Sequence, residues 1–321
     1  MTATKDQLTP QMVRDSLAAG DATLARRANV EYHDWEASSY DSKWSISYDQ
    51  RCVAYARDRF VHVAGRGGWP YGDALEVGCG TGFFLLNLAQ AGVLERGHVT
   101  DISPGMVAAA ERNAQALGFS VAGRVADAEQ LPYDDDCFDL VVGHAVLHHI
   151  PDVELALREA VRVLRPGGRF VFAGEPTRRG DYVARRLSRL TWFAATRITA
   201  LPPLRERWAR PPSQLAAQSA AAALESVVDL HTFDPDALAR SALRAGAVDV
   251  RTVTEELTAS WFGWPVRTLE FAVNPERLGL RWSMCAYRGW QRLSALDQHV
   301  LGRVVPDELF YNVCVTGTKP G

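Results

Sequence analysis

Three glycines alternate with small residues directly after a short apolar segment. Gly78, Gly80 and Gly82 follow residues 73–77, which have a strand pattern, and precede an apolar helical pattern that begins at Phe83. A parallel strand that enters a helix through glycines leaves backbone N–H groups free at the carboxyl edge of a sheet, beside the positive end of the helix dipole. This turn therefore predicts a site for a small-molecule cofactor.

The residues around the turn bear on which cofactor binds. The dinucleotide pattern G-x-G-x-x-G requires a small residue where this chain has Phe83, so the turn fits a pyrophosphate poorly. Asp101 ends a second strand pattern, where a carboxylate can accept hydrogen bonds from the two hydroxyls of a ribose. In the alternative interpretation Asp101 caps the helix expected over 104–117, a role that Ser103 can also fill.

Length and composition indicate a soluble enzyme. The chain has 321 residues, of which 47% are hydrophobic, a net charge of −3, and 5 cysteines without metal-binding spacing. The near-neutral charge argues against a nucleic-acid partner, and the separated cysteines favour reduced thiols in the cytoplasm. The acidic run 134–136 is interpreted as a solvated turn, so no metal site is expected. No apolar run approaches the roughly 18 residues of a membrane span.

Strand and helix patterns alternate from 73 to 176. This alternation predicts β-α-β units, and hence an α/β fold with a parallel sheet and helices on both of its faces. Strands are expected at 73–77, 97–101, 121–126, 138–143, 169–174, 248–257 and 310–318. Helices are expected at 82–92, 104–118, 152–164 and 234–245, with a short turn near 129–131.

Four sequence blocks, in this order, resemble the class I S-adenosylmethionine-dependent methyltransferases, particularly those of ubiquinone and menaquinone biosynthesis and of natural products. The blocks are Leu75–Gly82, Val99–Met106, Ala126–Pro132, and Phe138–Ile150 with Arg162–Gly168. The resemblance implies a Rossmann-like, seven-stranded, mostly parallel sheet with an antiparallel last strand and helical lid insertions. It also implies S-adenosyl-L-methionine as the cofactor and methyl transfer as the activity.

The resemblance further implies roles for residues around the cofactor. The three glycines of the turn would face its methionine part, Glu76 would help set the turn, and Asp101 would bind the ribose hydroxyls. Cys79 is expected to pack within the turn rather than to act as a nucleophile. Tyr40 lies in the segment 31–44, which resembles the helix that covers the cofactor in this family. Its ring could contact the sulfonium, or its hydroxyl the cofactor carboxylate.

The adenine end of the cofactor has its own implied residues. Ile102 would pack on the adenine, and Asp127 would accept a hydrogen bond from the exocyclic amine beside the backbone of Ala128. Asp127 could instead be a turn residue that caps 129–131. Three further aromatic residues share the ambiguity of Tyr40 between cofactor contact and helix packing: Tyr32, Trp35 and Trp44.

A methyl acceptor that carries a proton requires a base near the carboxyl end of the fourth or fifth strand. Four titratable residues follow these strands and are expected to converge on the mouth of the site, in the order of preference His148, Glu175, His144 and His149. Glu175 could orient an imidazole or take the proton itself, and His144 is also counted among the cofactor contacts. The histidines could instead be structural and hold the loop before Pro151.

The pattern divides the chain into a core and additions to it. These are an N-terminal cofactor-covering segment over 1–72, a cofactor-binding core over 73–176, a helical lid insertion over 177–233, and a completion of the core over 234–321 that contains a helical insertion at 259–309. Insertions at the carboxyl edge of an α/β sheet close over the ligand, so we expect them to select the substrate.

The first insertion contains an apolar stripe with helical spacing and several arginines off the stripe. The stripe consists of Val183, Leu187, Leu190, Ala194, Ile198 and Leu201. It predicts a lid helix packed on the core. Two alternatives are a basic amphipathic helix that makes peripheral membrane contact through 183–201, and a helix that binds a partner.

The second insertion carries Trp261, Trp264, Trp282 and Trp290, which would form core or face a flat, apolar acceptor. We therefore expect in-line methyl transfer to a small hydrophobic or amphipathic metabolite, lipid-like or aromatic. Oxygen is the expected acceptor atom, with carbon and nitrogen as alternatives. Two other classes stay open: a non-catalytic binding or scaffold protein on this fold, and an NAD(P)-dependent oxidoreductase.

Overall fold

A seven-stranded sheet forms the centre of the protein in a computed structural model that describes residues 8–37, 40–41 and 46–321. The strands are β1 (Tyr71–Val77), β2 (Leu94–Asp101), β3 (Val121–Val125), β4 (Phe138–His144), β5 (Leu164–Pro176), β6 (Val248–Glu255) and β7 (Asn312–Thr318). Their order is β3-β2-β1-β4-β5-β7-β6, and only the β7 pairings are antiparallel. The predicted fold class is confirmed.

Four helices follow the expected alternation with the strands. They are α5 (Phe83–Gln90), α6 (Pro104–Ala116), α7 (Val153–Val163) and α11 (Pro235–Arg244), and a short 3-10 turn, η1 (Leu147–His149), follows β4. Ser103 caps α6 by accepting a hydrogen bond from the backbone N–H of Met106. The alternative in which Asp101 is the cap is therefore wrong, because Asp101 lies two residues before the cap and accepts from the N–H of Ser103.

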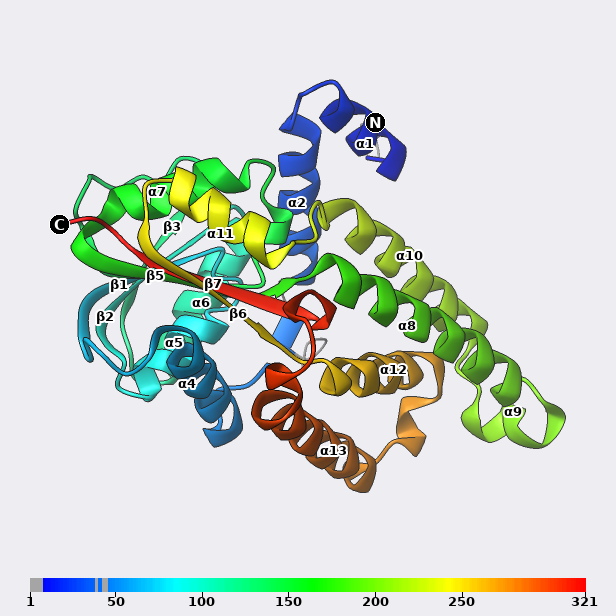
Figure 1. The fold of residues 1–321 in the computed structure, drawn as a ribbon. Coiled ribbons are helices and arrows are strands. Elements are labelled where there is room, and N and C mark those ends of the chain that lie inside the picture. Colours follow the sequence, from blue (N-terminus) through cyan, green and yellow to red (C-terminus); the bar gives the residue numbers. More distant parts are fainter. Residues whose placement is uncertain (1–7, 38–39, 42–45) are drawn as a thin grey trace.

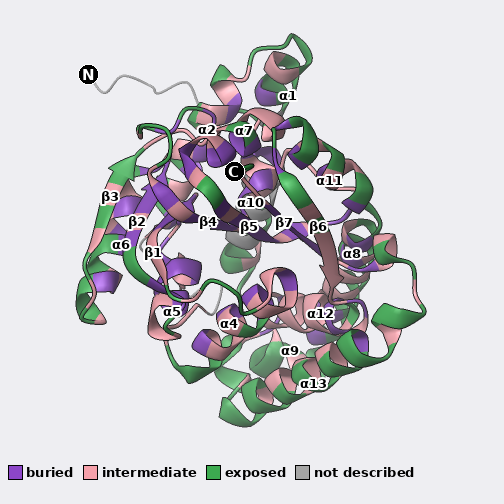
Figure 2. Cartoon of the chain, turned by 60° about the vertical axis from the view of Figure 1, so that its left-hand side comes forward, coloured by how far each residue is buried: buried purple, intermediate pink, exposed green. Residues whose placement is uncertain are grey.

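The core lies on both faces of the sheet, because neighbouring residues of a buried strand point to opposite sides. Val141 and Phe172 pack on the face covered by α7 and α11. Leu140, Val142 and Val171 pack on the other face, against α5, α6 and α4 (Gln50–Ala64). Figure 2 shows these central strands as the most deeply buried part of the molecule. Because β4 is packed on both faces, the position of its carboxyl end is fixed by the core.

The N-terminal helices lie over the carboxyl edge of the sheet. These are α1 (Pro10–Ala18) and α2 (Thr23–Glu36), with α4 following them. Asp34 at the end of α2 accepts hydrogen bonds from the backbone N–H of Gly105, at 2.9 Å, and from the hydroxyl of Ser103. This contact joins α2 to the start of α6 and so brings the N-terminal segment over the glycine turn.

The insertions form a helical projection beside the sheet (Figure 1). The first contains α8 (Arg178–Thr199), α9 (Pro202–Trp208) and α10 (Pro212–Val228), and the second contains α12 (Thr258–Ala272) and α13 (Leu280–His299). Three 3-10 turns lie near the second insertion: η2 (Pro275–Arg277), η3 (Leu301–Arg303) and η4 (Asp307–Leu309). Helix α12 packs against both α8 and α13, so one helix joins the two insertions.

The expected packing stripe of the first insertion is wrong. Helix α8 buries Gly180, Ala184, Ala195 and Thr199, whereas Leu190, Ile198 and Leu201 of the expected stripe are more than half exposed. The small residues allow α8 and α12 to approach each other closely, which large side chains at these positions would prevent. Hydrophobic periodicity alone favoured the wrong side of this helix.

The contact between α12 and α13 generates a prediction about stability. Helix α12 has no side-chain cap of its own. Instead Asp297 of α13 accepts hydrogen bonds from the backbone N–H groups of Thr258 (3.0 Å) and Ala259 (2.9 Å). Asp297→Ala leaves these buried donors unsatisfied, so we expect the free energy of unfolding to fall by about 1–3 kcal/mol in denaturant titrations. The exposed Asp236 provides the matched control, and an equal effect of Asp236→Ala would contradict the prediction.

Candidate active site

A large cavity opens at the carboxyl edge of the sheet, with a volume of about 870 Å³. Its lining comes from the glycine turn after β1, the ends of β2 and β4, and residues of α2, α4, α12 and α13. Cofactors and drug-sized ligands occupy cavities of roughly 300–1,000 Å³. One end of the lining is rich in backbone and carboxylate groups and the other is rich in aromatic rings.

The glycine turn needs its glycines for two different reasons. Gly78, Gly80 and Gly82 all have positive φ, at 62°, 50° and 85°. A Cβ at Gly78 would lie 2.0 Å from a methyl group of Val146, and one at Gly82 would lie 2.9 Å from Leu86. Gly78 and Gly80 line the cavity, whereas Gly82 packs the turn onto α5 and α6.

Two buried residues, Glu76 and Cys79, belong to the cavity lining and support the conformation of the turn. Glu76 is buried, and its Oε2 accepts a hydrogen bond of 3.1 Å from the backbone N–H of Leu85. Burial raises the pKa of Glu76 to about 8. Burial also raises the pKa of the Cys79 thiol, which lies against the carbonyl of Gly80. A buried thiol with a raised pKa packs well and is a poor nucleophile, as expected for Cys79.

Asp101 lies next to the turn and holds it in place. One carboxylate oxygen accepts the N–H of Gly80 and the other accepts the N–H of Ser103, both at 2.9 Å. A carboxylate has about four lone-pair sites, so each oxygen can accept one more hydrogen bond from the cavity. Burial raises the pKa of Asp101 to about 6. Ile102 follows it in the cavity lining.

Asp127 and Ala128 line the same end of the cavity. Asp127 forms an ion pair of 2.9 Å with Arg26 of α2 and accepts a hydrogen bond of 3.0 Å from the backbone N–H of Glu129. The turn-capping contact considered from the sequence is therefore present. It leaves acceptor capacity on the carboxylate, so recognition of an adenine amine by Asp127 stays a prediction.

The N-terminal segment fastens onto the glycine turn. The ring of Tyr40 lies over Gly80 and lines the cavity. A Cβ atom added to Gly80 would lie 3.8 Å from this ring. Two further residues of this segment contact Thr81. Asp41 accepts a hydrogen bond of 2.6 Å from the Thr81 hydroxyl, and Tyr48 donates one of 2.7 Å to the Thr81 carbonyl. Sequence patterns did not indicate either contact. Polar residues far from the motif carry no periodic signal, so only the fold associates them with the turn.

The other aromatic candidates of this segment have different positions. Tyr32 is buried within the N-terminal helices, with its hydroxyl 3.3 Å from Glu36. Trp35 is 64% exposed. Trp44 lies outside the described residues. Tyr40 is therefore the candidate of this group that the structure brings to the glycine turn.

The four candidate bases do not all converge on the cavity. His144 and His149 line it, but His148 and Glu175 do not. Glu175 is fully buried and accepts the ring N–H of His148 at 2.8 Å as well as three backbone N–H groups of residues 146–148. These four donors occupy the acceptor sites of the Glu175 carboxylate. Glu175 therefore holds the η1 turn in place. The expected convergence is wrong for this pair.

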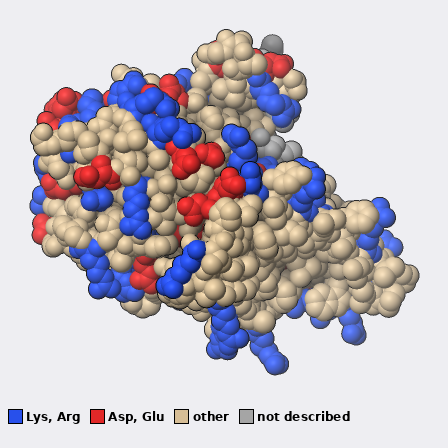
Figure 3. All heavy atoms as spheres, in the orientation of Figure 1, with Lys and Arg blue, Asp and Glu red and all other residues tan. Residues whose placement is uncertain are grey.

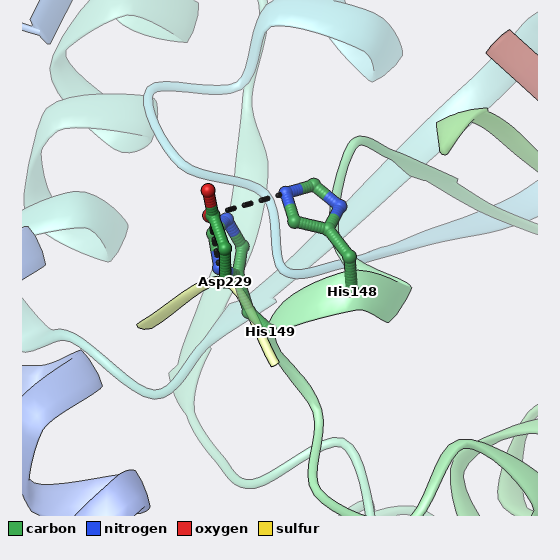
Figure 4. A group of neighbouring side chains, drawn as sticks. All are labelled: His148, His149 and Asp229. Carbon is green, nitrogen blue, oxygen red and sulfur yellow. Dashed lines mark ion pairs between the residues drawn. The ribbon is translucent and has the colours of Figure 1, made fainter. Parts of the chain in front are cut away.

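His148 and His149 also meet Asp229 at the end of α10 (Figure 4). The Nε2 of His148 and the Nδ1 of His149 lie 3.9 Å and 3.6 Å from Asp229 Oδ1. The pKa of His148 is raised, since the Glu175 carboxylate outweighs the effect of burial. Ligand atoms of the three residues lie within 4.8 Å of one another, close enough to hold a metal ion. About 80 residues separate Asp229 from the histidines, so sequence spacing did not reveal this group.

The opposite end of the cavity is an aromatic chamber. Its aromatic lining consists of Tyr55, Phe83, Phe262, Trp264, Trp282, Tyr287, Trp290 and Tyr311. Three of the four tryptophans of the second insertion therefore face the cavity, whereas Trp261 is outside the lining and 42% exposed. The indole N–H of Trp282 donates to Glu270 at 2.8 Å, which orients the ring in the chamber wall.

A buried ionic network lies at the inner end of this chamber. Arg59 of α4 pairs with Glu255 at 2.6 Å and Glu256 at 2.7 Å, and donates to the hydroxyl of Tyr55. That hydroxyl lies 3.4 Å from Nε2 of His144. Burial and the charge of Arg59 lower the pKa of His144 to about 3, so its ring is neutral near pH 7.

Backbone strain occurs at the same place. Ala145 and Glu256 adopt positive φ, at 53° and 66°, and both line the cavity. Non-glycine residues in this region cost of order 1–3 kcal/mol and are concentrated at functional sites. Burial raises the pKa of Glu256. Because almost 200 residues separate Arg59 from Glu256, no spacing pattern indicates this ion pair.

Comparison with known proteins agrees with this geometry. Residues 75–172 match the family described as a methyltransferase domain. The demethylmenaquinone methyltransferase of Shouchella clausii is 41% identical over 154 residues, which cover 46% of this chain and 64% of that protein. The mitochondrial arginine-hydroxylase NDUFAF5 of Danio rerio is 31% identical over 160 residues, 50% of this chain and 46% of its own. The chain thus spans about half the length of the curated relatives it matches.

A solved structure extends the similarity to the fold as a whole. Phosphoethanolamine N-methyltransferase 2 of Haemonchus contortus, in complex with S-adenosyl-L-methionine, superposes with a TM-score of 0.53 at 16% identity, over 99% of this chain and 61% of that one. The chain thus contains a methyltransferase domain and has the class I S-adenosylmethionine-dependent methyltransferase fold, which confirms the resemblance. Among the helices of the described residues, none is long and apolar enough to cross a membrane.

The buried carboxyl group of Glu76, directly before the turn, generates a prediction about pH. In the native state Glu76 keeps its proton up to about pH 8, whereas the unfolded chain releases it near the ordinary pKa of 4.5. Between these values the native state binds more protons, so this group makes the free energy of unfolding fall as pH rises. We expect Glu76→Gln to show a smaller fall from pH 5 to pH 8 than the wild type in denaturant titrations. Equal slopes for the two proteins would contradict this assignment.

Proposed function

We propose that the chain is an S-adenosylmethionine-dependent methyltransferase that acts on a small hydrophobic or amphipathic molecule by in-line transfer, with oxygen as the acceptor atom. One observation carries the proposal: the turn at Gly78 and Gly80, with Asp101 beside it, opens into the same cavity as the aromatic chamber. A donor site and an acceptor site within one cavity are what a transfer reaction between two bound molecules requires.

The polar end of the cavity fits the proposed cofactor. The carboxylate of Asp101 lines the cavity and has acceptor capacity for the ribose hydroxyls, and the methionine part would lie along Gly78 and Gly80, close to the ring of Tyr40. Ile102 and Asp127 would hold the adenine. When bound, S-adenosylmethionine supplies an electrophilic methyl group on a sulfonium that is already a good leaving group. The task of this chain is therefore mainly to position and desolvate the acceptor.

The aromatic end indicates the kind of acceptor. Rings such as those of Trp264, Trp282 and Trp290 present broad apolar faces, which suit a flat or isoprenoid molecule and exclude water from it. The cavity wall also contains Glu270 and Ser283, so the acceptor can carry polar groups at its edges. Small-molecule metabolites fit this lining better than nucleic acid.

The ionic network at the inner end supplies groups for the acceptor's proton. Among the predicted histidines, His144 lies in the chamber, and its neutral ring can accept a hydrogen bond that orients a hydroxyl. We propose Glu256 as the group that takes the proton, because it lines the chamber and burial raises its pKa towards the range of an efficient general base. Its ion pair with Arg59 fixes the position of the carboxylate.

Calorimetry with S-adenosylhomocysteine tests the cofactor half of the proposal. We expect Asp101→Asn to weaken binding about 10- to 100-fold, because hydrogen bonds to a charged acceptor contribute roughly 1.5–3 kcal/mol each. The exposed Asp134 provides a matched control, and Asp134→Asn should bind like the wild type. Binding of NAD(P) in place of S-adenosylhomocysteine would favour the oxidoreductase alternative.

Label transfer tests the acceptor half. With a methyl-labelled cofactor and host extract, we expect label in the small-molecule fraction, and we expect Glu256→Gln to lower the turnover by about 100-fold or more without changing cofactor affinity. His148 lies outside the cavity lining, so His148→Gln should have a turnover close to that of the wild type. The reverse pattern would restore His148 as the base. Cofactor binding without any labelled product would favour a scaffold protein.

A further inference from the structure

The outward face of α8 combines exposed apolar and basic side chains. Tyr182, Leu190 and Phe193 are 55%, 67% and 55% exposed, and Arg186 and Arg189 are exposed between them. These positions share one side of the helix, since residues three, four, seven and eight apart lie on one face. The side opposite them packs on α12.

Charge on this segment is of one sign. Residues 182–205 contain five arginines and no Asp or Glu. Figure 3 shows the same imbalance: the right-hand part of the molecule, formed by the helical insertions, displays Lys and Arg side chains and no Asp or Glu in this view. Arg186 and Arg197 lie over the rings of Tyr182 and Phe193, at 4.4 Å and 4.1 Å from the ring centroids. Neither forms an ion pair within the described residues.

We propose that this face of α8, defined by Tyr182, Arg186, Arg189, Leu190, Phe193 and Arg197, docks the protein onto the anionic surface of a lipid bilayer. Arginine headgroups would pair with lipid phosphates while their stems and the neighbouring apolar side chains enter the interface. Positive charge alone would suit nucleic acid equally well. The half-exposed Leu190 and Phe193 distinguish the two, because a phosphate backbone offers them no apolar partner.

The location of the face relates it to the cavity. Helix α12 packs on the inner side of α8, and its residues Phe262, Trp264 and Val266 line the aromatic chamber. The α8 face is therefore separated from the chamber wall by a single helix. A protein docked this way would hold its acceptor chamber close to the bilayer, from which an apolar acceptor could enter. The docking itself does not depend on methyl transfer and is tested without it.

Sedimentation with vesicles tests the proposal. We expect the wild type to bind vesicles of equal parts phosphatidylglycerol and phosphatidylcholine, and to bind pure phosphatidylcholine much more weakly. The variant Arg186→Gln/Arg189→Gln/Arg197→Gln should bind the anionic vesicles about 100-fold more weakly, because each basic residue near such a surface contributes roughly a factor of five. The second variant, Leu190→Ser/Phe193→Ser, should also bind more weakly, because its apolar insertion is lost.

A matched control removes the same charge from another face. Arg281, Arg288 and Arg292 are exposed on α13 and, like the α8 arginines, have no ion pair within the described residues. Their replacement by Gln should leave vesicle binding unchanged. Circular dichroism and melting temperature establish that each variant folds.

Several outcomes would overturn the proposal. They are no binding of the wild type to anionic vesicles, a loss of binding in the α13 control as large as in the α8 variant, or full binding by Leu190→Ser/Phe193→Ser. Equally tight binding to duplex DNA would assign the face to nucleic acid instead. A dimer in light scattering that becomes a monomer in Leu190→Ser/Phe193→Ser would assign it to a second copy of this chain.

Discussion

The conformation of the glycine turn is the constraint on which the rest of the site depends. Its three glycines hold positive φ, and two buried carboxyl groups secure the turn. Glu76 accepts from the N-terminus of α5, and Asp101 accepts from Gly80 and from the start of α6. These few hydrogen bonds join β1, α5, β2 and α6 at one edge of the sheet. Both groups are costly to bury, which is reflected in their raised pKa values.

The aromatic chamber depends on a different interaction, the buried pairing of Arg59 with Glu255 and Glu256. It connects α4, which precedes the sheet in the chain, with the end of β6, which follows the first insertion. Breaking a buried ion pair by removing one partner leaves an uncompensated charge and is strongly destabilising. The network therefore couples the shape of the chamber to the fold, and it holds Tyr55 beside His144 in the cavity lining.

Local sequence patterns predicted the structure correctly wherever it depends on neighbouring residues. The strand pattern before Gly78 and the cap at Ser103 were recognisable, because each depends on residues within one turn. The buried face of α8 was predicted wrongly. Close packing on α12 requires small side chains, so the small residues of α8 are buried and not the stripe of large apolar residues. His148 was predicted in the cavity, but the buried Glu175 turns its ring away.

By itself the sequence determined the α/β architecture, the glycine turn and the carboxylates Asp101 and Asp127, because motifs of this kind are contiguous and have a fixed order along the chain. Only the tertiary structure decided which titratable groups lie together beside the aromatic chamber. Arg59, His144 and Glu256 are brought together from three distant segments, through a direct ion pair and short polar contacts in a buried volume. Such contacts leave no periodic or spacing signal in a single sequence.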